Sequence, residues 1–213
     1  MQRGFFLALE GVDGSGKSTQ AQLLAVSLLQ QGWEVVLTQE PGSGPVGQKL
    51  RRYLQGAGRH LTPQEELDLF LADRREHVEQ VIKPALAAGQ IVITDRYYYS
   101  SVAYQGALGL DPAWILAENE TFAPRPDLVF LLVLPVAQAL ARLKRPRQVS
   151  EMLPYLERVA AIYHTLQGPH IQRLDAAASP QALHATLLAR TLEALEEYGG
   201  RGEGAQALTP DKC

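Results

Sequence analysis

The sequence predicts an α/β fold in which two layers of helices cover a five-stranded parallel sheet. Short apolar runs alternate with longer segments of helical periodicity along most of the 213 residues, as in sheets whose strands are joined by helices. The run at residues 128–134 is apolar throughout, as expected for a strand covered on both faces. The first run leads through a glycine-rich segment into a helix, the arrangement of a phosphate-binding loop. Together these features indicate a three-layer α/β/α P-loop fold.

Each strand is expected where an apolar run lies between turn signals. The five strands are expected at residues 5–10, 33–38, 91–95, 128–134 and 171–174. Helices are expected where apolar residues recur at helical spacing. They are expected at residues 17–31, 46–54, 62–81, 111–122, 135–144, 153–166 and 179–198.

Glycine, proline and capping residues mark several of these boundaries. Gly32 stops the first helix, and Thr62 is expected to cap the long helix, whose first turn holds Pro63 and Glu65. Pro84 is expected to end or bend that helix, because proline has no N–H to donate.

The chain is expected to form a single domain. Residues 1–198 form this domain, with a short lid at about 144–151, because neither a repeat nor a linker divides them. The glycine-rich residues 199–213 are expected to be a disordered tail.

Composition excludes several classes of protein. The chain is 46% hydrophobic and 20% charged, with a net charge of −3, which argues against nucleic acid or a membrane surface as a partner. No apolar stretch reaches the length of a membrane span, and no signal peptide is expected, because the first strand follows closely on Met1. Cys213 is the single cysteine, so the expected location is the reducing cytoplasm.

The glycine-rich segment has the spacing G-x-x-x-x-G-K-S of a P-loop. Its glycines allow a tight turn whose backbone N–H groups point at an anion. Lys17 adds a full charge for the outer phosphates, and the Ser18 hydroxyl is a candidate Mg²⁺ ligand. The residues expected to bind ATP are Gly11, Val12, Asp13, Gly14, Ser15, Gly16, Lys17, Ser18 and Thr19.

Further polar residues follow neighbouring strands. Glu40 comes after the second strand, and Asp95 with Arg96 ends the third. The carboxyl ends of parallel strands meet at one edge of the sheet, so these residues are expected to face the same crevice as the P-loop.

Each of these residues also has a purely structural interpretation. Asp13 either points to solvent or hydrogen-bonds a hydroxyl of a second substrate. Asp95 and Arg96 either form a structural ion pair or serve as a water-bridged Mg²⁺ ligand and a phosphate-binding fork. Phe70 and Arg74 share a helix face, where they either stack on a base and bond its edge or belong to the core and the solvated surface.

A basic cluster lies in the expected lid. Lys144, Arg145 and Arg147 flank Pro146, and such a run is commonly a solvated face. The P-loop contains no arginine, however, and phosphoryl transfer needs cations around the transferring group. A basic lid would supply them.

Four segments resemble the thymidylate kinase family, and the resemblance extends to about residue 197. The most specific part is Asp-Arg-Tyr at 95–97 followed by Ser-Ser-Val-Ala-Tyr-Gln-Gly at 100–106. The other segments lie at residues 69–86, 38–42 and 126–128. The resemblance implies that the chain is a nucleoside monophosphate kinase that transfers the γ-phosphate of ATP to dTMP, with Mg²⁺ as cofactor, and that it is a homodimer.

The resemblance also implies roles for individual residues. Phe70 would stack on thymine, Arg74 would bond the base edge, and Tyr104 would pack under the sugar. Arg96 would hold the dTMP phosphate and Asp13 the 3′-hydroxyl. Ser18 would ligate Mg²⁺, and Asp95 would support it through water. The residues expected to bind dTMP are Asp13, Glu40, Phe70, Arg74, Arg96, Ser101, Tyr104 and Gln105, and those expected to be catalytic are Lys17, Arg96, Arg145 and Arg147.

The chain departs from the family pattern near the lid and the monophosphate. Position 39 is Gln where the family usually has Arg, and strand residue 133 is Val where an acidic residue is frequent. The lid lacks the usual Asp, with Glu151 the remaining acidic residue. Two alternatives therefore stay open: a diverged relative with another acceptor or weak activity, and a P-loop ATPase switch.

Overall fold

The fold is a parallel sheet between two helical layers, as expected. A computed structural model describes residues 3–56, 60–143 and 149–203. In this structure β1 (Phe6–Glu10), β2 (Val35–Gln39), β3 (Ile91–Asp95), β4 (Leu128–Val133) and β5 (Ile171–Asp175) form one sheet. All its pairs are parallel, and the strand order is β2-β3-β1-β4-β5.

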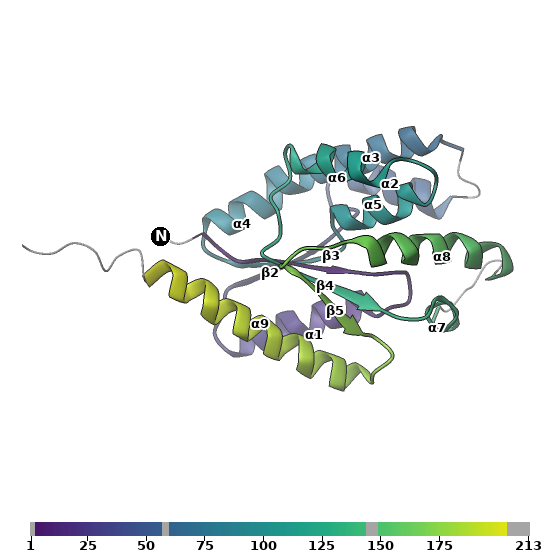
Figure 1. Ribbon diagram of the computed structural model, residues 1–213. Helices are drawn as coiled ribbons and strands as arrows, with labels where there is room; N and C mark the ends of the chain where they lie inside the picture. Colours follow the sequence, from purple (N-terminus) through teal and green to yellow (C-terminus); the bar gives the residue numbers. More distant parts are fainter. Residues whose placement is uncertain (1–2, 57–59, 144–148, 204–213) are drawn as a thin grey trace, which may run out of the picture.

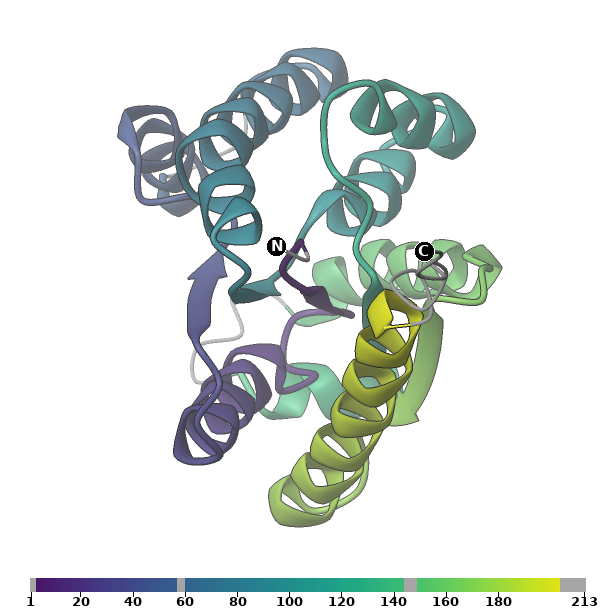
Figure 2. The same cartoon turned by 90° about the vertical axis from the view of Figure 1, so that its left-hand side faces the viewer.

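Helices cover both faces of this sheet (Figure 1). One layer contains α1 (Lys17–Gln30) and α9 (Pro180–Glu203), which pack against each other. The opposite layer is built mainly from α3 (Pro63–His77), α4 (Lys83–Ala87), α5 (Tyr98–Gly106) and α8 (Val149–Thr165), with α2 (Pro45–Gln55) and α6 (Pro112–Glu120) against it. Figure 2 shows β2 and β5 at opposite edges of the sheet.

The core lies around the central strands. Every residue of β1 is buried, and β3 and β4 are buried except at their last residues. The edge strand β2 is only partly covered, and its residues Leu37 and Gln39 are exposed. Because β1 lies between β3 and β4, the segments that follow these three strands emerge side by side at one end of the sheet. α7 (Val136–Ala141) lies at this end, after β4.

The long helix after Thr62 shows how the chain accommodates Pro84. Thr62 and Glu65 form a reciprocal capping box, as the sequence predicts. The helix neither ends nor breaks at Pro84. It widens into a π-helical turn at Val78–Ile82, where the Lys83 N–H bonds the Val78 carbonyl five residues earlier, and then continues as α4.

Two predictions about helices were wrong. Helix α5 was not expected, because Tyr98–Gly106 carries polar and small residues on nearly every side; all but Tyr104 and Gly106 of its residues are nevertheless buried. Helix α9 was expected to end near Tyr198, yet it continues through the glycines to Glu203, so residues 199–203 are not a disordered tail. The remaining tail, 204–213, lies outside the described residues, as does most of the lid, 144–148.

Within the described ranges, the helices are too short or too polar to cross a membrane.

Candidate active site

The P-loop joins β1 to α1 and folds tightly beneath a cavity. Gly14 has φ 83°, and a Cβ there would lie 2.1 Å from the Ala139 carbonyl oxygen of α7, so no larger residue fits. Gly16 has φ 98° and begins α1 in the left-handed region. The loop therefore depends on glycine both for its curvature and for its contact with α7.

Lys17 is folded back over this loop. Its Nζ donates to the Val12 carbonyl oxygen at 2.8 Å, and the residue is 5% exposed. Burial, with the nearby Arg96 charge, lowers the pKa of Lys17 to about 8. A bound polyphosphate would compensate this buried charge, which is the role expected for a P-loop lysine.

The cavity above the loop has a volume of about 630 Å³. Residues 13–20 form its floor, and Arg96 closes one end. The far end is lined by Arg142 and Leu143 after α7 and by Ala176, Ala178, Pro180 and Leu183 at the start of α9. Lys17, Arg96 and Arg142 give its lining positive charge, which suits a nucleoside polyphosphate with the phosphates at the loop and the base toward Arg142.

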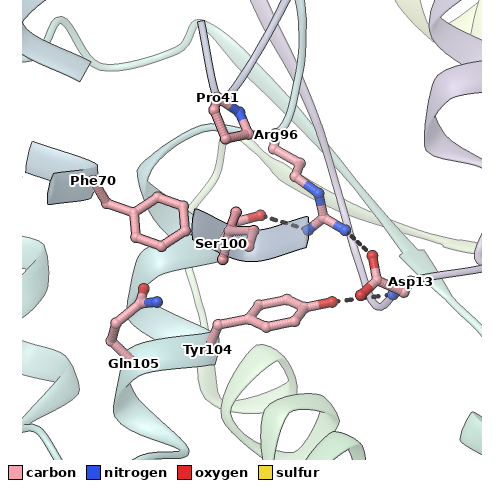
Figure 3. A pocket seen from close by; sticks show the side chains of 8 residues that line it. Asp13, Pro41, Phe70, Arg96, Ser100, Tyr104 and Gln105 are labelled. Atoms are coloured by element: carbon pink, nitrogen blue, oxygen red, sulfur yellow. Dashed lines mark hydrogen bonds and ion pairs between the residues drawn. The ribbon is translucent and has the colours of Figure 1, made fainter. Parts of the chain in front are cut away.

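A second cavity of about 260 Å³ lies on the other side of Arg96. Figure 3 shows Phe70 and Gln105 at one end and Asp13 at the other, with the Tyr104 ring between them. The full lining is Asp13, Pro41, Leu54, Phe70, Arg96, Ser100, Tyr104 and Gln105. Asp13 and Arg96 line both cavities. Ligands in the two cavities would therefore meet at this pair.

Arg96 has an unusual backbone conformation, and its guanidinium contacts two side chains of the site. Its φ is 72°, and it is the one non-glycine residue with positive φ in the described part of the chain. Its Nη1 donates to Ser100 Oγ at 3.1 Å, and its Nη2 forms an ion pair with Asp13 (Figure 3). The Asp13 N–H donates to Tyr104 Oη at 3.1 Å. Asp13 is thus turned toward the second cavity rather than away from it.

Ser18 and Asp95 fit an Mg²⁺ site. Ser18 Oγ donates to Asp95 Oδ2, and Asp95 Oδ1 is buried without a hydrogen-bond partner among the described residues. A buried carboxylate oxygen without a partner is costly, and a metal-bound water would satisfy it. Both groups offer the hard oxygen atoms that Mg²⁺ prefers.

Glu40, Arg74 and Ser101 lie behind the second cavity rather than in its wall. Arg74 is 1% exposed. It donates to Glu40 Oε2 from Nε at 2.9 Å and from Nη2 at 2.6 Å, to Asn119 Oδ1 at 2.6 Å and to Ser101 Oγ at 3.1 Å. Burial alone would raise the pKa of Glu40, but Arg74 and His77 outweigh it and hold that pKa below its ordinary value.

Gln105 offers a free acceptor beside the second cavity. Its Nε2 donates to Glu66 Oε1 at 3.0 Å, which fixes the orientation of the amide. Its Oε1 is buried and accepts nothing from the part of the chain that the structure describes. A ligand N–H group would satisfy this oxygen.

Several residues of the site were not predicted. Pro41, Leu54, Ser100 and Arg142 line the cavities, and Glu10 is buried beside them. Of these residues, only Glu10 has a sequence feature that could have drawn attention to it, because it is a carboxylate at the end of an apolar strand. Conversely, Gln39 is exposed at the end of β2, outside both linings, and the predicted catalytic residues Arg145 and Arg147 lie outside the described residues.

Comparison with known proteins identifies the family. Residues 9–187 match the family model described as thymidylate kinase. The thymidylate kinase of Desulfotalea psychrophila is 46% identical over 180 residues, which cover 83% of this chain and 88% of that protein. A thymidylate kinase of Xanthomonas campestris is 47% identical over 199 residues, or 90% of this chain and 86% of that protein. A probable thymidylate kinase of Pyrococcus horikoshii is 42% identical over 196 residues, which cover 88% of this chain and 95% of that protein. The chain therefore belongs to the thymidylate kinase family.

Proposed function

We propose that the protein transfers the γ-phosphoryl group of ATP to dTMP, giving dTDP and ADP. The observation that carries this proposal is the meeting of two cavities at Asp13 and Arg96. One cavity has a P-loop floor suited to a triphosphate, and the other has aromatic walls suited to a nucleotide base. A donor and an acceptor bound in this way would face each other across Arg96.

The second cavity accounts for a thymine nucleotide as acceptor. Phe70 presents an aromatic face for the base, and Gln105 Oε1 is an acceptor for the N3–H of thymine. Arg74 is held by Glu40 and Asn119 behind the wall, so it would support the site from there, and its contact with the base edge stays a prediction. Tyr104 lines the same cavity and would lie under the sugar, which would favour a deoxynucleotide.

Asp13 and Arg96 would exchange partners when dTMP binds. In the structure they pair with each other. The phosphate of dTMP would offer Arg96 a second anion in bidentate geometry, and the Asp13 carboxylate would accept from the 3′-hydroxyl. The ion pair therefore keeps both side chains in place before the acceptor arrives.

Transfer would need positioning and charge more than a base. A nucleotide monophosphate has a second pKa of about 6, so its oxygen is already anionic near neutral pH. That oxygen would attack the γ-phosphorus in line, while Lys17, the loop amides and Arg96 stabilise the spreading charge. Arg145 and Arg147 of the lid stay predicted as further cations. The bond between the γ-phosphorus and the oxygen that bridges it to the β-phosphate would break, and ADP would leave with the electron pair of that bond.

Ser18 and Asp95 would hold the magnesium ion, Ser18 directly and Asp95 through water. The ion would neutralise charge on the β- and γ-phosphates of bound ATP. This assignment is supported by Asp95 Oδ1, which has no hydrogen-bond partner among the described residues, and by the bond from Ser18 Oγ to Asp95 Oδ2. The homodimer and the cytoplasmic location stay predictions.

A panel of acceptors tests the proposal. ADP release would be followed with dTMP, dUMP, dCMP and dGMP at equal concentrations, and with no acceptor. We expect dTMP to give the highest kcat/KM and ADP release without acceptor to be negligible. A preference for another monophosphate would indicate a diverged acceptor site. ADP release at the same rate with and without an acceptor would indicate an ATPase switch.

A further inference from the structure

Glu10 is a buried carboxylate that the proposed transfer does not use. It is the last residue of β1, directly before the P-loop, and it is completely buried. The rest of the strand, Phe-Leu-Ala-Leu, is apolar. Burying a carboxylate is costly unless donors surround it, so this residue must have a compensating environment.

Four donors supply that environment. Oε1 accepts from the backbone N–H of Tyr97 at 2.8 Å and of Ser100 at 3.2 Å. Oε2 accepts from Ser100 Oγ at 2.6 Å and from Tyr163 Oη at 3.0 Å. Burial raises the pKa of Glu10, and Ser100 and Arg96 offset part of this rise. Three elements, β1, α5 and α8, therefore meet at one carboxylate.

The bond to Ser100 decides which way its hydroxyl proton points. A serine hydroxyl has a single proton, and the short contact to Glu10 takes it. Ser100 Oγ is therefore an acceptor toward Arg96 Nη1, 3.1 Å away. Without Glu10, the same proton would be free to turn toward Tyr163 Oη, 3.0 Å away, or toward the guanidinium, so the hydroxyl would no longer be fixed in one orientation beside Arg96.

Glu10 also fixes the backbone beside Arg96. A positive φ is unfavourable for an arginine and persists only where the surroundings enforce it. The Arg96 N–H bonds the Leu9 carbonyl oxygen at 3.0 Å, and the next N–H, that of Tyr97, bonds Glu10. The last two residues of β1 thus hold both amides of this turn.

We propose that Glu10 is a positioning residue that, through Ser100 and the Tyr97 amide, holds the Arg96 guanidinium toward the phosphate of the acceptor. The inference rests on the proposed function for the identity of that acceptor. The hydrogen bonds of Glu10 go to Tyr97, Ser100 and Tyr163, and its electrostatic effect on Lys17 is smaller than that of Asp13 or Asp95. We therefore expect Glu10 to matter more for dTMP binding than for ATP binding.

Binding measurements on Glu10→Gln test this inference. We expect the Kd for dTMP, measured by titration calorimetry, to rise about tenfold, as for the loss of one charge-assisted interaction. The KM for dTMP should rise equally, and the KM for ATP should stay within about twofold. The control is Asp127→Asn, which removes a carboxylate that accepts from the Phe6 N–H at 2.8 Å at the opposite end of β1. It should change neither constant.

A double-mutant cycle with Ser100→Ala separates positioning from general damage. If Glu10 acts through Ser100, the double variant binds dTMP about as weakly as the weaker single variant. Fully additive losses, or equal rises in the KM of both substrates, would overturn the inference. Ser100→Ala alone keeps the question decidable if Glu10→Gln does not fold, because an unchanged Kd for dTMP in that variant would also overturn it.

The same experiment distinguishes this inference from the proposed function. A wild-type protein that binds dTMP but forms no dTDP would contradict the proposed transfer, while the Kd values of the variants would still decide the role of Glu10. A wild-type protein that does not bind dTMP would overturn both.

Discussion

At the scale of single residues, Lys17 links burial to catalysis. Its pKa is lowered to about 8 because burial, together with the Arg96 charge, disfavours the ammonium form. Only the protonated form can neutralise phosphate charge, and kcat/KM reports the ionisation of the free enzyme. We therefore expect kcat/KM for ATP to fall as pH rises, by about tenfold for each pH unit above about 8.

The control for this pH dependence is the variant Lys17→Met. It should have very low turnover and should lose the alkaline fall, because no ammonium remains to titrate. A wild-type kcat/KM that stays level up to about pH 10, where free lysine begins to titrate, would show that Lys17 is not buried as described.

Phe70 tests the acceptor side of the site. Stacking a base on an aromatic ring is worth about 1–3 kcal/mol, so Phe70→Ala should raise the KM for dTMP about tenfold or more. The KM for ATP should change little, because Phe70 lines only the second cavity. The matched control is Phe122→Ala, which removes a ring that packs against the Arg75 guanidinium instead. Equal effects of Phe70→Ala on both substrates would argue against stacking.

Sequence reasoning found most of the chemical residues but not their partners. The spacing of the P-loop and the strand ends placed Lys17, Ser18, Asp95 and Arg96 together, because backbone geometry alone brings these positions to one edge of the sheet. The orientation of Arg74 was not predictable in this way. Its guanidinium is turned inward by Glu40 and Asn119, which lie 34 and 45 residues away along the chain.

At the scale of elements, the contact between α1 and α9 shapes the donor cavity, the cavity above the P-loop that is expected to bind ATP. Gln20 of α1 is 2% exposed, and its Nε2 donates to the Pro180 carbonyl oxygen at 2.9 Å, where α9 begins. Pro180 lines the far end of the ATP cavity. This single bond ties the helix after the P-loop to the segment expected to hold the base of ATP.

Replacing Gln20 by Leu should therefore weaken the binding of ATP without weakening the binding of dTMP. We expect its KM for ATP to rise about fivefold, the effect of one buried hydrogen bond, with the KM for dTMP unchanged. Ser27→Ala is the control, since Ser27 Oγ and His184 Nε2 form a second α1–α9 bond of 2.9 Å further along the helices. If both variants affect ATP equally, the contact stabilises the helix pair and does not shape the cavity.

Elements with clear local signals were predicted well, and the others were not. The capping residues of the helix after Thr62 and the apolar strands gave their positions almost to the residue. Helix α5 was missed because its residues are buried on nearly all sides, between α3, α6 and α8, so its sequence shows no amphipathic period. The extension of α9 through Gly199 and Gly200 shows that two glycines lower helix propensity without ending a long helix.

At the scale of the whole molecule, strand order explains why the active site has two halves. The strand β1 lies between β3 and β4, so the P-loop after β1 is adjacent to Asp95 at the end of β3 and to Arg96 directly after it. The second cavity, expected to bind the acceptor dTMP, then lies toward α3 and α5, and the donor cavity lies toward α9. The sequence predicted the parallel sheet and this common edge, but the order of the strands required the structure.

The central claim is direct phosphoryl transfer between ligands in the two cavities. The most direct measurement is to incubate the purified, folded protein with ATP, dTMP and Mg²⁺ and to quantify dTDP and ADP by chromatography. The two products should form in equal amounts, and omitting dTMP should abolish both. Absence of dTDP, or ADP formation at the same rate without dTMP, would contradict the account.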